Sequence, residues 1–198
     1  MPHYFRKNWE PVESTSLIRW VLPPLTLSFH TASGVFSRSR VDPGTRLLVK
    51  LVFKEPQADR FLDLACGYGP VGIALGGLRW AKRLHFCDVN FRALRLLQRN
   101  LEQNRVQGWI HCGDGAGAIG EGMFDAAGLN PPVRAGKETV LRLVHGGLAC
   151  LRPQGRLYLV MRTRQGALSL PKTPSLVDVS FFELGKGAGY RVFRLEKH

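Results

Sequence analysis

The feature that most constrains this fold is a repeated alternation of short apolar runs and longer amphipathic segments. The apolar runs predict buried strands at 60–65 (RFLDLA), 83–89 (RLHFCDV), 109–114 (WIHCGD), 124–130 (FDAAGLN) and 155–164 (GRLYLVMRTR). Helices are predicted after the glycine turn that begins at Gly67, over 91–104, and over about 136–150. Strands that alternate with helices indicate an α/β fold with a mainly parallel sheet and helices on both faces.

The two ends of the chain predict further strands. Residues 16–30 read as two short strands separated by a turn at Pro23-Pro24, and a loop follows them. Asp42 and Pro43 then have the pattern of an N-cap followed by proline in the first helical turn. At the other end, the runs DVSFFELG and YRVFRLEK predict an antiparallel hairpin around 185–189, which completes a seven-stranded sheet. We therefore expect one domain over 1–198, with an N-terminal extension (1–41) that carries short strands and a loop, and a core over 42–198.

Charge and cysteine content narrow the class of partner. The 198 residues contain 28 Lys and Arg against 15 Asp and Glu, a net charge of +13, which favours a polyanionic partner such as RNA over a merely solubilising surface. The four cysteines (66, 87, 112 and 150) have no two-residue spacing, so no metal site is predicted. The N-terminus has no apolar segment typical of a signal peptide, and no stretch approaches eighteen uncharged apolar residues, so we expect a cytoplasmic protein that does not enter a membrane, as a monomer or a homodimer.

A glycine turn follows the first buried strand and is the first candidate ligand site. Gly67 and Gly69, with Gly72, match the pattern GxGxxG, which nicotinamide, flavin and sulfonium nucleotide binders share and which a tight strand-to-helix turn also satisfies. Asp63 stands just before the turn, where a carboxylate would repel a pyrophosphate and attract an ammonium or sulfonium group. A cationic nucleotide ligand is therefore favoured.

Two further aspartates end the next two strands. Asp88 is placed to accept hydrogen bonds from ribose hydroxyls, and Asp114 from an adenine amino group. Either aspartate alone has the alternative of a helix cap. Together with Asp63 they favour an adenosine-containing ligand, and by themselves they leave NAD and S-adenosylmethionine open.

The fourth strand ends at Asn130-Pro131-Pro132, a second candidate site. The Asn130 side-chain oxygen and the Pro131 carbonyl could accept both N–H groups of an exocyclic amine, which would orient a poorly nucleophilic nitrogen for methyl transfer. The prolines restrict the backbone, so these acceptors would be preorganised. The alternative is a strand that two prolines simply terminate.

Four of these segments, in this order, resemble a known family. DLACGYG (63–69), CDVN (87–90), GD (113–114) and NPPVRAGKE (130–138) are similar to class I S-adenosylmethionine-dependent methyltransferases, most of all to the small-domain type typified by ribosomal RNA small subunit methyltransferase C, a 16S rRNA guanine-N2 enzyme. The resemblance extends over HTASGVFSRSRVDPGT (30–45), RTRQGA (162–167) and GAGYRVFR (187–194). It implies a Rossmann-like class I methyltransferase fold and S-adenosylmethionine as the cofactor.

The resemblance also implies roles for individual residues. Cofactor contacts are expected from one set of residues: Asp63, Gly67, Tyr68, Gly69, Asp88, Asp114, Phe36 and Ser37. Amine positioning is expected from Asn130, Pro131 and Pro132. Contacts to the RNA substrate are expected from Phe36, Arg38, Arg40, Val133, Arg134 and Lys137.

This chain departs from the family at position 133, where many amine methyltransferases carry an aromatic residue that stacks on the target base. The residue here is Val133, so we expect another ring, Phe36, to stack instead. The guanine-N2 enzyme also carries an additional amino-terminal domain that has no counterpart in these 198 residues.

The expected activity is N-methylation of an exocyclic amine, foremost guanine N2 in rRNA. Alternatives within this chemistry are adenine N6, a tRNA guanine and a protein glutamine amide. An RNA-binding protein that retains the cofactor without turnover is a different class, and a nicotinamide oxidoreductase is the weakest alternative.

Overall fold

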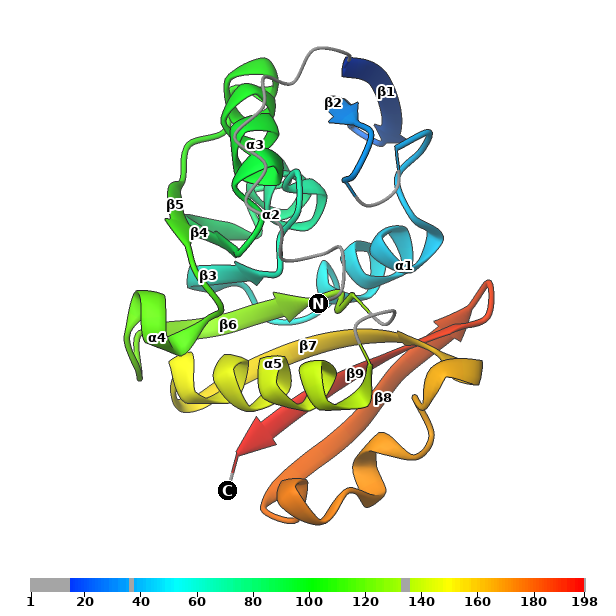
Figure 1. Cartoon of the computed structure of the whole chain (residues 1–198), viewed down its shortest axis with the longest axis vertical. Coiled ribbons are helices and arrows are strands. Elements are labelled where there is room, and N and C mark those ends of the chain that lie inside the picture. The colour runs from blue at the N-terminus through cyan, green and yellow to red at the C-terminus, as the bar shows by residue number, and fades with distance from the viewer. Residues whose placement is uncertain (1–14, 36–37, 133–135, 198) are drawn as a thin grey trace.

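A seven-stranded sheet forms the centre of the computed structural model, which describes residues 15–35, 38–132 and 136–197 (Figure 1). The strand order is β5-β4-β3-β6-β7-β9-β8, with parallel pairing from β5 to β7 and antiparallel pairing through β9 and β8. The strands are β3 (Ala58–Leu64), β4 (Ala81–Asp88), β5 (Trp109–Cys112), β6 (Phe124–Leu129), β7 (Leu151–Arg162), β8 (Val179–Gly187) and β9 (Tyr190–Lys197). The predicted mainly parallel sheet with an antiparallel C-terminal hairpin is confirmed.

Helices cover both faces of this sheet, as predicted. One face carries α1 (Pro43–Val52), α2 (Pro70–Gly77) and α3 (Phe91–Asn104), and the other carries α4 (Ala116–Ile119) and α5 (Lys137–Cys150) with three short 3₁₀ turns between 163 and 176. Successive side chains of β3 point to opposite faces of the sheet and belong to two separate cores. Phe61 packs in the core on the α1–α3 side, and Leu62 packs in the core on the α5 side. Neither α4 nor the 3₁₀ turns were expected from the sequence pattern.

An N-terminal hairpin of β1 (Thr15–Leu22) and β2 (Leu25–Ala32) turns at Pro23–Pro24 and packs against α3 (Figure 1). Two asparagines one helical turn apart on α3 bind the backbone of β2. The Asn100 amide accepts from the His30 N–H at 2.6 Å and donates to the His30 carbonyl at 3.1 Å. Asn104 makes the same pair of bonds with Ser28, at 2.9 and 2.8 Å. These amides satisfy a strand edge that would otherwise expose its backbone groups.

The order of the strands brings two distant sequence motifs together. The chain runs from β3 outward through β4 to β5, then returns to β6 on the other side of β3. Leu64 at the end of β3 pairs in register with Leu129 at the end of β6. The glycine turn and the Asn130 segment therefore leave adjacent strands at the same edge of the sheet, where open α/β sheets bind their ligands.

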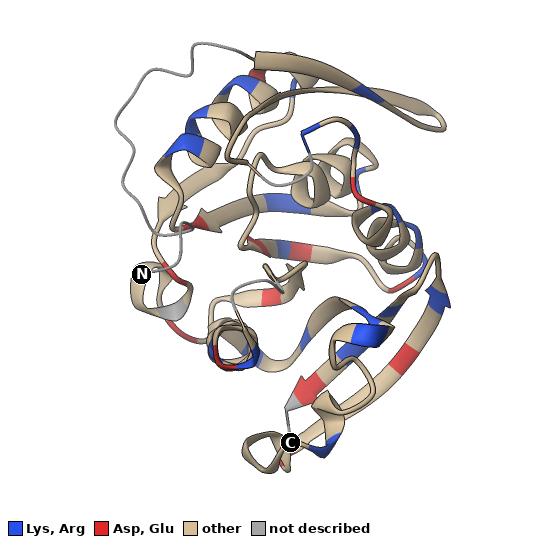
Figure 2. Cartoon of the chain, turned by 45° about the vertical axis from the view of Figure 1, so that its right-hand side comes forward, with Lys and Arg blue, Asp and Glu red and all other residues tan. Residues whose placement is uncertain are grey.

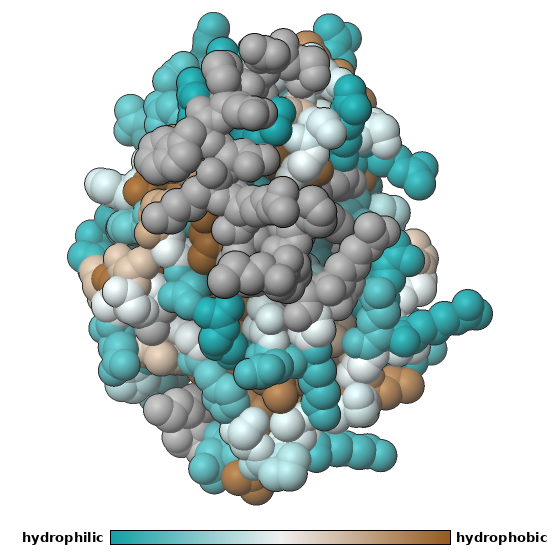
Figure 3. All heavy atoms as spheres, viewed as in Figure 1, coloured by the Kyte–Doolittle hydropathy of each residue, from teal (hydrophilic) through white to brown (hydrophobic). Residues whose placement is uncertain are grey.

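The surface is basic and mainly hydrophilic. Figure 2 shows Lys and Arg on helices and strands along much of the chain, with Asp and Glu interspersed. On the face in Figure 3, apolar side chains are scattered among hydrophilic ones. Within the described ranges, every helix is too short or too polar to cross a membrane.

We predict that Asn100→Ala destabilises the protein far more than the matched change Asn104→Ala. Asn100 is fully buried and also donates to the Tyr68 carbonyl at 2.9 Å, so its loss leaves one buried and two partly buried backbone groups without a partner. We expect a loss of about 2–4 kcal/mol in the free energy of unfolding, since each unsatisfied buried group costs about 1–3 kcal/mol. Asn104 is partly exposed, so water replaces its bonds at a cost of about 1 kcal/mol or less. Urea denaturation measures both, and equal losses would contradict this prediction.

Candidate active site

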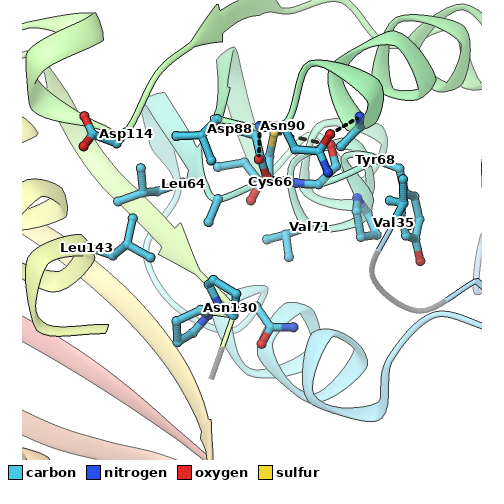
Figure 4. A pocket seen from close by; sticks show the side chains of 18 of the residues that line it. Val35, Leu64, Cys66, Tyr68, Val71, Asp88, Asn90, Asp114, Asn130 and Leu143 are labelled. Atoms are coloured by element: carbon cyan, nitrogen blue, oxygen red, sulfur yellow. Dashed lines mark hydrogen bonds between the residues drawn. The ribbon is translucent and has the colours of Figure 1, made fainter. Parts of the chain in front are cut away.

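A cavity lies at the carboxyl ends of β3, β4 and β6 (Figure 4). Its volume is about 920 Å³ when the open solvent at its mouth is included. Its walls include the glycine turn on one side and the end of β6 on the other. The lining residues are mostly apolar, with three carboxylates and two carboxamides among the polar ones: Val35, Thr45, Asp63, Leu64, Ala65, Cys66, Gly67, Tyr68, Pro70, Val71, Asp88, Val89, Asn90, Ala93, Gly113, Asp114, Asn130, Pro131, Pro132, Thr139, Arg142 and Leu143. Mostly apolar walls with a few polar groups are typical of a small-molecule site.

The glycine turn forms one wall because its backbone adopts left-handed conformations. Ala65, Gly67 and Gly69 have φ values of 53°, 56° and 90°. Gly69 is the N-cap of α2, and a Cβ there would collide with Leu97 on α3. Gly67 lines the cavity with nothing near its absent Cβ, so a ligand can approach its backbone closely. The structure thus assigns Gly69 to the turn and Gly67 to the cavity wall.

Two buried aspartates hold this turn in place. The Asp88 carboxylate accepts from the Gly67 N–H and from the Asn90 N–H, both at 2.8 Å. Asp63 accepts from the Gly72 N–H in α2, also at 2.8 Å. Both carboxylates line the cavity, and no salt bridge to either is found within the described part of the chain.

Burial raises the pKa of both aspartates. For Asp63 the increase is large and the nearby Asp88 adds to it, against the opposing bond from Gly72. For Asp88, burial outweighs the hydrogen bonds from Asn90 and Gly67. Among the described residues neither carboxylate has a cationic partner, and two such desolvated carboxylates favour a positively charged ligand.

Asp114 has a partner that the sequence did not indicate. It lines the cavity at the end opposite Val35, and its carboxylate forms an ion pair with Arg142 of α5 (Figure 4). Both side chains are about half exposed. Asp114, the predicted acceptor for an adenine amino group, therefore lies at the cavity but is already paired with Arg142.

Asn130 follows the last residue of β6 and lies across the cavity from Asp88 and Cys66 (Figure 4). Pro131 and Pro132 line the cavity beside it. The Asn130 amide nitrogen donates to the Thr45 hydroxyl of α1 at 2.9 Å. This bond leaves the side-chain oxygen as the end of the carboxamide that can accept from a ligand.

The other predicted residues divide into three groups. Tyr68 lines the cavity, but its ring is buried edge-on against Phe29, and burial raises the pKa of its hydroxyl. The side chains predicted to contact RNA that the structure describes are exposed and lie outside the lining set: Arg38, Arg40 and Lys137. The remainder lie outside the described residues: Phe36, Ser37, Val133 and Arg134.

Several lining residues were not predicted as site residues. Val35 and Thr45 belong to the segment 30–45, whose resemblance to the family was a signal for the loop but not for these side chains. Asn90 ends the quoted CDVN motif, and its side chain caps α3. Arg142 and Leu143 lie on α5, where helical periodicity alone gives no hint that one face borders a ligand cavity.

Comparisons with known proteins identify the family. The methyltransferase small domain family matches residues 26–194. A Bacillus subtilis (strain 168) protein, uncharacterized protein YbxB, is 37% identical over 98% of both chains. Ribosomal RNA small subunit methyltransferase C of Haemophilus influenzae (strain PittGG) is 30% identical over 72% of this chain. A solved structure, the T. thermophilus 16S rRNA N2 G1207 methyltransferase (RsmC) in complex with AdoMet and guanosine, superposes with a TM-score of 0.80 at 25% identity over 97% of this chain.

The chain belongs to the methyltransferase small domain family, and its fold is the Rossmann-like fold of S-adenosylmethionine-dependent methyltransferases. The protein is an S-adenosylmethionine-dependent methyltransferase, and S-adenosylmethionine is its cofactor. The expected enzyme class and the expected cofactor are therefore confirmed. The cavity fits this cofactor, because its two buried carboxylates suit an ammonium group and its apolar walls suit an adenosine. The chain covers 41% of the Haemophilus methyltransferase C and 53% of the T. thermophilus chain.

We predict that Asp63→Asn raises the free energy of unfolding at neutral pH. The native Asp63 carboxyl keeps its proton to a higher pH than the unfolded chain does, so the wild type loses stability as pH rises from the ordinary pKa of 3.8 through the raised native pKa. Asparagine can still accept from Gly72 and has no charge to desolvate, which gives an expected gain of about 1–3 kcal/mol at pH 7.

The measurement is urea denaturation of both proteins from pH 4 to pH 8, with the exposed Asp178→Asn as the control. The gain from Asp63→Asn should grow with pH over this window, whereas the control should track the wild type. A gain that shrinks as pH rises would show that the native pKa of Asp63 is lowered instead.

Proposed function

We propose that the protein methylates an exocyclic amine of a nucleobase in RNA, and that the amine is N2 of a guanine in rRNA. The observation that carries this proposal is the Asn130 carboxamide at the end of β6, which is tethered through its nitrogen and whose oxygen has no hydrogen-bond partner among the described residues. An amine is a donor with two N–H groups, so it is complementary to an oxygen here together with the Pro131 carbonyl.

The residues of this site would bind and orient, and no general base is needed. S-adenosylmethionine supplies an activated methyl group on its sulfonium. Asp63 would attract the ammonium group of the cofactor, Asp88 would accept from its ribose, and the Gly67 turn would let its backbone approach closely. Asn130 would hold the amine in line with the methyl group, and orientation of this kind contributes about 7–11 kcal/mol when alignment is good. The methylated amine is acidic and loses its proton to solvent.

The choice of guanine N2 in rRNA rests on the relatives. The Haemophilus protein is named a small subunit rRNA methyltransferase, and the T. thermophilus structure is titled a 16S rRNA N2 methyltransferase with guanosine bound. The net charge of +13 is consistent with an RNA substrate. Because this chain covers about half or less of those proteins, the same target nucleotide is not implied.

We predict that Asn130→Ala lowers the single-turnover rate of methyl transfer by at least about 100-fold, because the amine loses its positioning acceptor. The affinity for S-adenosylhomocysteine, measured by calorimetry, should stay within about twofold, since the cofactor contacts come from β3 and β4. An unchanged rate would remove Asn130 from the mechanism.

The substrate is tested directly by incubating the protein and labelled S-adenosylmethionine with total RNA, ribosomal subunits and ribosomal proteins from a strain that lacks it. Mass mapping of the products should find N2-methylguanosine in rRNA. Label in N6-methyladenosine, in tRNA or on a protein glutamine would each replace the proposed acceptor by another amine. Cofactor and RNA binding with no product from any fraction would indicate a non-catalytic RNA-binding protein.

A further inference from the structure

We propose that Thr45 is a positioning residue for methyl transfer, which fixes the orientation of the Asn130 carboxamide. This inference rests on the proposed role of Asn130. Thr45 lies in the first turn of α1 and is 2% exposed, yet it lines the cavity. Its hydroxyl accepts from the Asn130 amide nitrogen at 2.9 Å across 85 positions of sequence.

A carboxamide has two ends of nearly equal shape and opposite hydrogen-bonding character. If the amide of Asn130 rotated by half a turn, it would present N–H groups to an amine that itself carries N–H groups. In the structure the nitrogen end is bonded to the Thr45 hydroxyl, and this bond restrains rotation of the carboxamide away from its observed position. Thr45 thereby holds the carboxamide in the observed arrangement, in which the oxygen is the end left for the ligand.

Thr45 can do this because α1 is itself held firmly. The Asp42 side chain accepts from the Gly44 and Thr45 N–H groups at 2.8 and 3.2 Å, and from the Tyr190 hydroxyl of β9 at 2.9 Å. A Cβ at Gly44 would lie 2.6 Å from the Tyr190 ring, so helix and ring are in direct contact. Asp42 is 6% exposed. A buried network therefore links β9, the start of α1 and the tip of β6.

The test compares Thr45→Val, which keeps the branched shape and loses the hydroxyl, with Thr45→Ser, which keeps the hydroxyl. The substrate is rRNA from a strain that lacks the protein, assayed at saturating S-adenosylmethionine. We expect Thr45→Val to lower kcat about 10- to 100-fold, as for a misplaced group, with KM for the RNA and the affinity for S-adenosylhomocysteine within about twofold. Thr45→Ser should restore kcat to within about threefold of the wild type.

Thr173→Val is the matched control, because Thr173 is also buried and lies on the segment 163–176, outside the residues that line the cavity. It should leave kcat unchanged. If Thr45→Val does not fold, Thr45→Ala and Thr45→Ser supply the same comparison, since they too differ in the hydroxyl. Urea denaturation confirms that the compared variants are folded.

The outcomes separate this inference from the proposed function. If Asn130→Ala is inactive and Thr45→Val is fully active, the role of Thr45 is wrong and that of Asn130 stands. If Thr45→Ser is as slow as Thr45→Val, the hydroxyl is not the cause and the inference also fails. If Asn130→Ala is fully active, the proposed mechanism fails together with the role of Thr45.

Discussion

The structure of the site depends on two hydrogen bonds from backbone N–H groups to buried carboxylates. Asp88 at the end of β4 binds the Gly67 N–H, and Asp63 near the end of β3 binds the Gly72 N–H. These bonds fix the left-handed turn between β3 and α2, and they leave the charges of both aspartates at the cavity wall. The raised pKa values indicate that the native state bears an energetic cost for this arrangement. A cationic ligand bound beside these aspartates would relieve that cost, so the desolvated carboxylates would favour its binding.

The order of the strands places Asn130 opposite the glycine turn, so that the two segments line the same cavity. The reversal of strand order places β6 beside β3, with Leu64 and Leu129 in register. Asn130 is therefore held one residue beyond the sheet, opposite the turn, although 60 residues separate it from Pro70 at the start of α2. The sheet edge sets the distance between the glycine turn and Asn130, and neither side of the cavity needs a long loop to reach the other.

The sequence was sufficient for the order and type of the main elements, because each carries its own periodicity or cap. The α3 prediction of 91–104 matches the structure, since Asn90 caps one end and Arg105 ends the other in a left-handed conformation. The sequence was not sufficient to predict side-chain contacts between elements that are distant along the chain. The bond between Thr45 and Asn130 and the ion pair between Arg142 and Asp114 join elements whose pairing no local pattern encodes. The helix α4 is only four residues long, which is too short for helical periodicity to be visible in the sequence.

The choice of a neutral amide at position 130 follows from the charges around it. Asp63 and Asp88 already place two desolvated carboxylates at the cavity, and a third acid at the tip of β6 would raise their pKa values further. An asparagine gives an acceptor oxygen without adding charge. A carboxylate, however, accepts at both ends, whereas an amide has a correct and an incorrect orientation. In this fold the amide nitrogen is held by the buried hydroxyl of Thr45, which restrains the side chain with its oxygen as the remaining acceptor.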